Sequence, residues 1–333
     1  MTPSRILFRT VGSEAIGLGH VRRSLALADA VRTLGGEPLF AVAGDRRAVE
    51  LVRVAGFEAT PVARDTIAAS LTGIHAVVVD DYAATSADLA RLATERMVGV
   101  IDDLADRELD VQLVVNGSAG AAALRYRGGA RTQLLLGPRF IPLRAEFGEA
   151  PARSVSATLQ RVLLTVGGAD PAAVTERLLA ATRRVLPHVA IDVIAGPLAT
   201  RVDRLREAAR AHAAAVVLHE DPKDVRALML AADVAVSGGG QTLYELAATA
   251  TPAVAIRLAD NQTLNLTNLQ TEGTLLWAGD AGDADLETML TSALMVLAEN
   301  RGRRAELSRR GRALVDGRGA ARVAAAILDG LRR

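Results

Sequence analysis

Short apolar runs alternate along the chain with longer segments in which apolar residues recur every three or four positions. The apolar runs have the length and aliphatic content of buried strands and lie at residues 5–11, 38–43, 75–81, 97–103, 111–115 and 132–136. The segments with helical spacing lie at residues 21–34, 45–55 and 86–96. Strands that alternate with helices in this way predict βαβ units and a parallel sheet.

The alternation stops near residue 140 and starts again at residue 161. Residues 148–160 have no apolar period, so we predict a linker there. From residue 286 to the end, the chain predicts helices interrupted at Gly302, Gly311 and Gly317. We therefore expect an α/β protein with two doubly wound, Rossmann-like domains at residues 1–150 and 151–333. In such a pair, the glycine loop of each half lies at the carboxyl edge of its sheet and faces a shared cleft.

A glycine-rich turn at residues 237–245 joins an apolar run to a helical segment in the second half. The first N–H groups of a helix lack partners within it, and the helix dipole favours negative charge there. Consecutive glycines let a phosphate approach the main chain, and a carboxylate one turn into the helix suits a ribose diol. The turn therefore predicts a nucleotide diphosphate site. The residues assigned to it are Gly167 and Gly168, from a similar turn, and Gly238, Gly239, Gly240, Gln241, Thr242 and Glu245.

Composition narrows the classes of function. The 333 residues include 39 basic and 38 acidic side chains, and only 3% are aromatic, so nucleic acid is a poor candidate partner. The chain has no cysteine, which excludes thiol catalysis and cysteine-based metal sites. We see no signal peptide and no apolar run of the roughly 18 residues that a membrane span needs. We therefore expect a soluble, cytoplasmic protein.

His20 is the main candidate for catalysis in the first half. It follows Gly17 and Gly19 at the start of a helical segment, where the helix N-terminus disfavours an imidazolium. A neutral histidine there could accept a proton from a reacting group. The alternative is a surface histidine at a helix start.

Two pairs of carboxylates follow buried strands of the first half. Asp80 and Asp81 end one strand, and Asp102 and Asp103 end the next, at the edge of the sheet where active sites gather. Carboxylates at this position can also cap the following helix, so either role stays open. No histidine pair has metal-ligand spacing, and we therefore expect no protein-bound metal.

Several segments resemble one family. Residues 17–28, 79–82, 100–104, 136–147 and 166–170 occur in the order seen in PseG/SpsG-like proteins. That family includes the UDP-sugar hydrolase of pseudaminic acid biosynthesis and a relative linked to spore coat polysaccharide. Residues 237–245, together with Asn261 and Gln262, resemble both this family and the glycosyltransferase that makes lipid II, MurG.

The resemblance implies a GT-B fold in which the second domain holds most of the UDP and no metal or cofactor is required. It also implies that His20 matches the catalytic histidine of the family and that Tyr82 matches a tyrosine on the substrate side, and we assign both residues to catalysis. The residues assigned to other substrate contacts are Arg9, Gly17, Gly19, Asp81, Asn261 and Gln262.

We therefore expect a nucleotide-sugar hydrolase that cleaves the anomeric bond of a UDP-sugar and releases UDP. A glycosyltransferase would use the same base and leaving group, with an acceptor hydroxyl or amine in place of water. A nucleotide-sugar binding protein without catalysis is the third alternative. The sequence leaves open the sugar, the acceptor, the nucleotide, the pathway and the oligomeric state.

Overall fold

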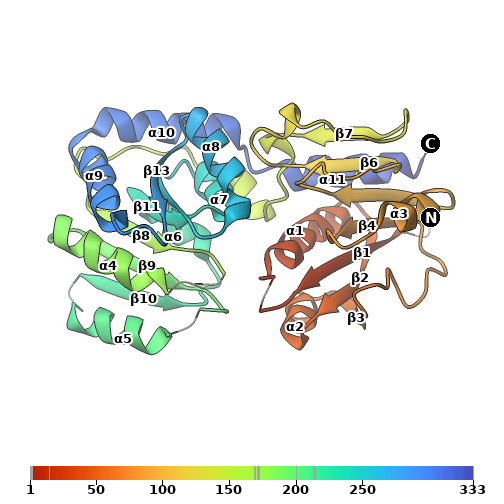
Figure 1. Cartoon of the computed structure of the whole chain (residues 1–333), viewed down its shortest axis with the longest axis horizontal. Coiled ribbons are helices and arrows are strands. Elements are labelled where there is room, and N and C mark those ends of the chain that lie inside the picture. The colour runs from red at the N-terminus through yellow and green to blue at the C-terminus, as the bar shows by residue number, and fades with distance from the viewer. Residues whose placement is uncertain are drawn as a thin grey trace. The chain divides into compact units, whose positions relative to one another are not determined.

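The computed structural model describes residues 3–14, 16–168, 170, 173–199, 201–212 and 215–332. The chain divides into two compact units (Figure 1). Unit 1 comprises residues 1–148 and 317–333, and unit 2 comprises residues 149–316.

Unit 1 contains a seven-stranded sheet in the order β3-β2-β1-β4-β5-β6-β7, and every neighbouring pair of strands is parallel. Its strands are β1 (Arg5–Gly12), β2 (Glu37–Gly44), β3 (Glu58–Val62), β4 (Ala76–Asp80), β5 (Met97–Ile101), β6 (Leu113–Asn116) and β7 (Gln133–Leu136). Its α-helices are α1 (Gly19–Thr33), α2 (Arg46–Val54), α3 (Ser86–Ala93) and α11 (Gly319–Gly330). Short 3-10 helices span Ala121–Ala123, Pro138–Phe140 and Ala145–Glu149, the last of which crosses into unit 2.

Unit 2 contains a six-stranded parallel sheet in the order β10-β9-β8-β11-β12-β13. Its strands are β8 (Arg161–Thr165), β9 (Ala190–Ala195), β10 (Val216–Glu220), β11 (Val234–Gly238), β12 (Ala253–Arg257) and β13 (Leu275–Asp280). Its helices are α4 (Val174–Val185), α5 (Val202–Ala211), α6 (Val225–Ala231), α7 (Thr242–Ala248), α8 (Thr263–Thr271), α9 (Leu286–Glu299), α10 (Arg301–Leu314) and the 3-10 helix η4 (Asp260–Gln262).

Both sheets have the strand order of a doubly wound fold, as the sequence predicts. In each sheet, the second and third strands along the chain lie on one side of the first strand, and the fourth strand lies on its other side. The strand order therefore reverses between β1 and β4 and between β8 and β11. Loops that leave two such strands at their carboxyl ends diverge, and the space between them is the usual ligand site of an open α/β sheet. These two points therefore locate the candidate sites.

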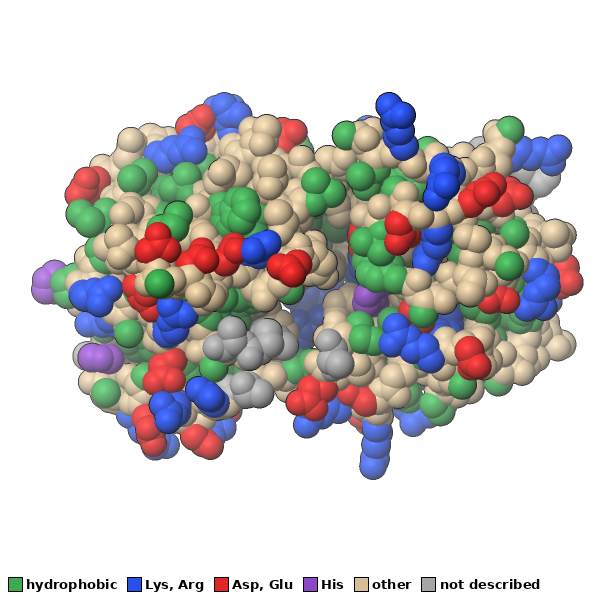
Figure 2. All heavy atoms as spheres, in the orientation of Figure 1, with side chains coloured by type: hydrophobic (Ala, Val, Ile, Leu, Met, Phe, Trp, Pro, Cys, Tyr) green, Lys and Arg blue, Asp and Glu red, His purple; other side chains and the backbone are tan. Residues whose placement is uncertain are grey.

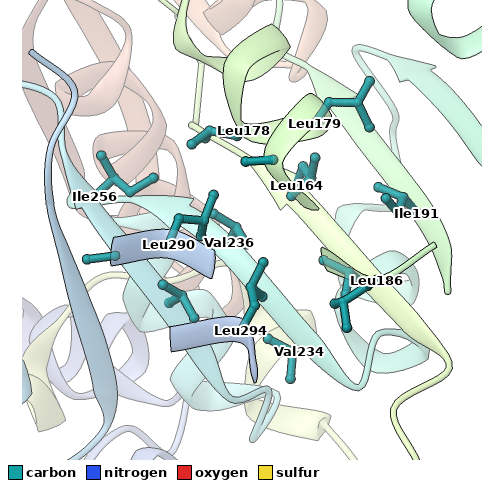
Figure 3. Close-up of a cluster of buried hydrophobic side chains, with 14 of the residues drawn as sticks. Leu164, Leu178, Leu179, Leu186, Ile191, Val234, Val236, Ile256, Leu290 and Leu294 are labelled. Atoms are coloured by element: carbon teal, nitrogen blue, oxygen red, sulfur yellow. The ribbon is translucent and has the colours of Figure 1, made fainter. Parts of the chain in front are cut away.

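Aliphatic side chains from strands and helices form the core of each unit. In unit 2, Leu164, Val236 and Ile256 of the sheet pack with leucines of α4 and α9, which Figure 3 shows from close by. In unit 1, valines of β4 and β5 pack against Leu89 and Leu92 of α3. β4 is buried at all five positions, as is typical of a parallel strand covered on both faces.

The C-terminal helix differs from the expected division of the chain. We expected residues 151–333 to form one domain, but α11 belongs to unit 1 and packs against α1. A Cβ atom on Gly319 would lie 2.1 Å from the carbonyl oxygen of Ile141, and Arg322 donates to the carbonyl oxygen of Arg139 at 2.9 Å. The apolar period of this helix predicts that it packs, but it carries no information about which unit it packs on.

Two of the expected helix breaks lie inside a helix. Gly302 and Gly311 both belong to α10, whereas Gly317 does lie between α10 and α11. Gly311 is buried, and a Cβ atom there would lie 3.2 Å from the Cα atom of Ala247 in α7. This glycine therefore serves the close contact of two helices and does not end one of them.

Acidic and basic side chains are interspersed over the face of the molecule in Figure 2, in keeping with the nearly equal totals of the two kinds. Within the described part of the chain, no helix is long and apolar enough to cross a membrane.

Candidate functional site

The loop that leads to His20 is closed by its own backbone. Ser13 and Gly17 exchange hydrogen bonds between their main-chain N–H and C=O groups, at 2.7 and 3.3 Å. Gly17 has a φ of +83°, which other residues rarely adopt, so glycine is required there for the turn itself. α1 then begins at Gly19, and His20 is its second residue. The loop thus places His20 at the carboxyl end of β1, beside the switch point of the first sheet.

Asp80, the last residue of β4, orients the imidazole of His20. Its Oδ1 atom lies 2.6 Å from Nδ1 of His20, and the Asp80 side chain is fully buried. A carboxylate can only accept a hydrogen bond, so Nδ1 carries the hydrogen and donates it to Asp80. In the neutral ring, Nε2 is then left with a free lone pair. This is the arrangement that a histidine needs to act as a general base.

Arg23 lies one helical turn after His20 and connects the carboxylates of two strands. Its Nε and Nη2 atoms donate to the two oxygens of Asp80, each at 2.6 Å, and its Nη1 atom donates to Oδ2 of Asp103 at 2.6 Å. Paired, two-point contacts between arginine and carboxylate are strong and fix the geometry of both groups. Arg23 therefore holds β4 and the loop after β5 at set positions relative to α1.

The phenol ring of Tyr82 lies beside the imidazole of His20. The two rings make an edge-to-face contact with centroids 4.8 Å apart, and the phenol of Tyr82 donates to Oδ2 of Asp103 at 2.5 Å. Arg107 in turn donates to the Tyr82 carbonyl oxygen at 2.5 Å. The structure thus brings together the two residues that the sequence assigns to catalysis.

The charges of this cluster shift its pKa values in opposite directions. Burial alone would raise the pKa of Asp80, but the charges of Arg23 and then His20 outweigh it and lower that pKa to about 2. Burial would lower the pKa of Arg23, and Asp103 and Asp80 instead hold it well above its usual value. Burial and Asp103 raise the pKa of Tyr82, against the opposing charge of Arg23. Tyr82 is therefore a neutral hydrogen-bond donor, and Asp80 is ionised, over the physiological range.

Arg9 and Asp81 lie apart from this cluster and below the surface. Both side chains are 2% exposed and pair with each other at 3.2 Å, and Arg9 also donates to the carbonyl oxygens of Thr10, Arg64 and Thr66. These contacts connect β1 to the segment around residue 65. The geometry therefore favours a structural role for Arg9 and Asp81, in which they hold this segment against β1. A contact of either residue with substrate stays a prediction. Gly17 and Gly19 each have open space where a Cβ atom would lie.

The two glycine turns that the sequence assigns to a nucleotide lie side by side in unit 2. They follow β8 and β11, which are neighbours in the sheet, at its switch point. A Cβ atom on Gly167 would lie 3.8 Å from Oγ1 of Thr242, and one on Gly238 would lie 2.9 Å from the carbonyl oxygen of Val166. Ala169 and Pro171, in the same turn, lie outside the described residues. Segments about 70 residues apart in sequence therefore form one edge.

The three consecutive glycines serve different purposes. On Gly238 and Gly239, a Cβ atom would come within 3.0 Å of neighbouring side chains, those of Leu258 for the first and of Leu266 and Gln262 for the second. On Gly240 it would meet only Gln262, at 3.9 Å. Packing thus explains the first two glycines, while Gly240 and Gly167 are the ones whose backbone stays open.

Gln262 and Glu245 border the same turn from two helices. Gln262 accepts a hydrogen bond from the Leu258 N–H at 2.9 Å and so folds back over Gly239. Glu245 is half-buried in the first turn of α7, the helix that begins at Thr242 directly after Gln241. Asn261 is exposed on η4. Asn265, which the sequence does not single out, donates to the Gly239 carbonyl oxygen at 2.8 Å and fixes the turn.

Three residues of the first cluster are absent from the sequence-based assignment. The sequence is compatible with either a functional or a capping role for Asp80 and Asp103, and it assigns no role to Arg23. Asp102, by contrast, accepts hydrogen bonds from the N–H groups of Leu104 and Ala105, as a local cap would. The spacing of three between His20 and Arg23, which puts both on one face of a helix, is the signal that could have identified Arg23.

Among the described residues, no group of three or more histidine, aspartate and glutamate side chains is placed to hold a metal ion. The acidic residues around His20 are instead engaged with Arg23, with Tyr82 and with backbone N–H groups.

The fold of the chain is GT-B, the two-domain architecture of many glycosyltransferases. MurG of Acinetobacter baumannii has a TM-score of 0.67 at 15% identity, covering 98% of this chain and all of that one. The calicheamicin glycosyltransferase CalG4 has a TM-score of 0.62 at 14% identity, covering 100% and 99%. HepE of Anabaena, solved with UDP, has a TM-score of 0.60 at 12% identity, covering 98% and 99%.

Sequence comparison narrows this class. The chain is 25% identical to the spore coat polysaccharide biosynthesis protein SpsG of Bacillus subtilis over 219 residues, which are 65% of this chain and 64% of SpsG. It is 23% identical to the uncharacterised protein MJ1062 of Methanocaldococcus jannaschii over 76% of this chain and 55% of that one. No family model matches the chain. With the fold, these relatives support an SpsG-like GT-B family for this chain, as its motifs predict.

Proposed function

We propose that the protein is a nucleotide-sugar enzyme that cleaves the anomeric bond of a UDP-sugar with water as the acceptor. The observation that carries the proposal is the contact of 2.6 Å between His20 Nδ1 and the buried Asp80, at the switch point of the first sheet. The similarity to SpsG and the UDP bound to HepE support a nucleotide sugar as the substrate class.

In this reaction, Nε2 of His20 accepts a proton from water as the water oxygen attacks the anomeric carbon. The new carbon–oxygen bond forms as the bond to the diphosphate oxygen breaks, and UDP leaves with that electron pair. The imidazolium that forms is stabilised by Asp80, to which Nδ1 already donates. The ring of Tyr82 packs edge-to-face with the imidazole of His20 and so restricts the rotation of the imidazole.

We assign the diphosphate to the turns of unit 2. Gly240 and Gly167 have the open backbone that a phosphate needs, and their turns meet at the carboxyl edge of the sheet. Preorganised N–H groups at this edge would stabilise the charge that develops on the departing diphosphate. The hydroxyl of Thr242, 3.8 Å from the Cβ position of Gly167, lies between the two turns and is a further donor.

Hydrolysis in ¹⁸O-labelled water tests the reaction. Incubated with a panel of UDP-sugars and no other acceptor, the enzyme is expected to release free sugar that carries the label and UDP that does not. Label on UDP would show attack at phosphorus and would contradict the role of His20. UDP released only when a cell extract supplies an acceptor would establish a glycosyltransferase, which is the activity named for CalG4, a structural neighbour of this chain.

The Glu245→Ala variant tests the nucleotide site. We expect it to weaken UDP binding by about 1–3 kcal/mol, the range for a lost hydrogen bond to a charged group, while the fold is kept. Calorimetric titration of the full chain with UDP measures the loss. The exposed Glu299 provides the control, because Glu299→Ala removes a carboxylate of the same kind at the last residue of α9, which is part of neither glycine turn. Equal affinities for both variants would argue against this site.

A further inference from the structure

Asp103 is an acidic residue that the proposed reaction does not use directly. It contacts neither the reacting atoms nor His20, but it accepts hydrogen bonds from both groups that flank His20. Arg23 donates to its Oδ2 atom at 2.6 Å, and the phenol of Tyr82 donates to the same atom at 2.5 Å. A carboxylate with this position can act on the base through its neighbours.

The charges around His20 explain why a second carboxylate matters. Arg23 binds both oxygens of Asp80, and its Nη2 atom lies 3.2 Å from Nδ1 of His20. With Asp80 and Arg23 alone, the two charges cancel and the guanidinium repels an imidazolium. Asp103 adds a second negative charge, so that two carboxylates and one guanidinium leave one net negative charge. A proton on His20 then makes the cluster neutral.

Resting on the proposed function, we infer that Asp103 is a positioning residue that sets the strength of His20 as a base by neutralising Arg23. It also holds the ring of Tyr82 against the imidazole. The charge of Asp80 thereby stays available to the imidazolium that forms when His20 takes a proton from water. In a partly buried cluster, charges this close interact more strongly than in water, so removing one of them changes the basicity of His20.

The charged and titratable groups that face His20 come from three elements. Asp80 belongs to β4, Arg23 to α1 itself and Tyr82 to the loop after β4, while Asp103 lies behind the last two in the loop after β5. Tyr82 contributes no charge, because burial and Asp103 keep its pKa raised. The balance therefore depends on Asp80, Arg23 and Asp103.

Two single variants and their combination test the inference through the pH profile of kcat/KM. Asp103→Asn removes a negative charge, so the acidic limb is expected to move to lower pH by about one unit, the low end of the effect of a nearby charge. Arg23→Met removes the positive charge, so the limb is expected to move to higher pH by a similar amount. The double variant restores the balance, and its limb is expected to return toward that of the wild type.

A structural defect would not move the limb in opposite directions, nor would the double variant repair it. Unmoved limbs, or limbs that move in the same direction, would overturn the inference. Asp192→Asn is the matched control, because Asp192 contacts His219 at 2.8 Å and Arg161 at 2.6 Å in unit 2, and its limb is expected to stay in place. If the acidic limb of the wild-type profile were still present in His20→Gln, this result would instead contradict the proposed function.

NMR titration of the His20 ring gives a second measurement that needs no turnover. The chain has five histidines, and the His20→Gln variant identifies the signals of this one. In Asp103→Asn the ring is expected to take up its proton at lower pH than in the wild type, by about the same one unit. If Arg23→Met does not fold, this titration decides the question. An unchanged titration in Asp103→Asn would overturn the inference.

Discussion

The His20→Ala variant is expected to turn over a UDP-sugar about 10²–10⁴-fold more slowly than the wild type, the usual contribution of a positioned base. UDP affinity should be kept, because the residues assigned to the nucleotide belong to unit 2 and His20 belongs to unit 1. The fold should also be kept, since Asp80 retains both of its contacts with Arg23. Steady-state kinetics together with UDP titration separate these effects.

The pH profile makes this prediction specific to a base. A histidine must be neutral to accept a proton, so the wild-type rate should fall toward acidic pH, and the variant should lack this limb. His75→Ala is the matched control in unit 1, because His75 accepts a hydrogen bond from the Arg5 N–H at 3.0 Å, away from the cluster, and its removal should leave turnover unchanged. If His20→Ala were only a few-fold slower with an unchanged profile, His20 would be an ordinary residue of a helix start.

The fold was largely predictable because its signals are local. Apolar runs and helical periods identify all but one of the strands and helices between residues 5 and 101 to within a few residues, and Asp45 caps α2 as expected. β3 was missed, because Glu58–Val62 carries a proline and alternates weakly, as an edge strand can. The unit to which α11 belongs was also missed, because packing partners are not encoded in a helical period.

The candidate site was predictable only in part, for the same reason. His20 and the glycine turns lie at strand–helix junctions, which a sequence displays directly. The roles of Asp80 and Asp103 depend instead on β4 lying beside β1 and on β5 lying beside β4. This arrangement lets Arg23 form hydrogen bonds with Asp80, 57 residues later in the sequence, and with Asp103, 80 residues later. The order of strands in a sheet is a tertiary property, so the partners of His20 become visible only in the fold.

Asp80→Asn is expected to have the largest combined effect of any single change in the cluster. An amide cannot neutralise Arg23 or stabilise an imidazolium, so turnover should fall by about 10²-fold or more. Breaking a buried ion pair on one side typically costs about 3–5 kcal/mol, and Asp80 is fully buried between Arg23 and His20. Urea unfolding and steady-state kinetics of the same variant measure the two losses.

The pH dependence of that stability loss distinguishes a lost charge from a packing defect. The pKa of Asp80 lies at about 2 in the folded protein, against a usual value of 3.8, so ionised Asp80 stabilises the fold by about 2 kcal/mol above pH 4. This contribution is lost as the pH falls from about 4 to about 2, because the carboxyl then takes up a proton in the folded state as well. The difference in unfolding free energy between the wild type and Asp80→Asn should therefore shrink over that interval. Asp88→Asn, at the exposed start of α3, is the control, and it lacks the buried ion pairs of Asp80. If the difference in unfolding free energy between the wild type and Asp80→Asn were the same at pH 3 and pH 7, the carboxylate of Asp80 would not be paired as the structure shows. His20 would then lack the partner on which its role as a base depends.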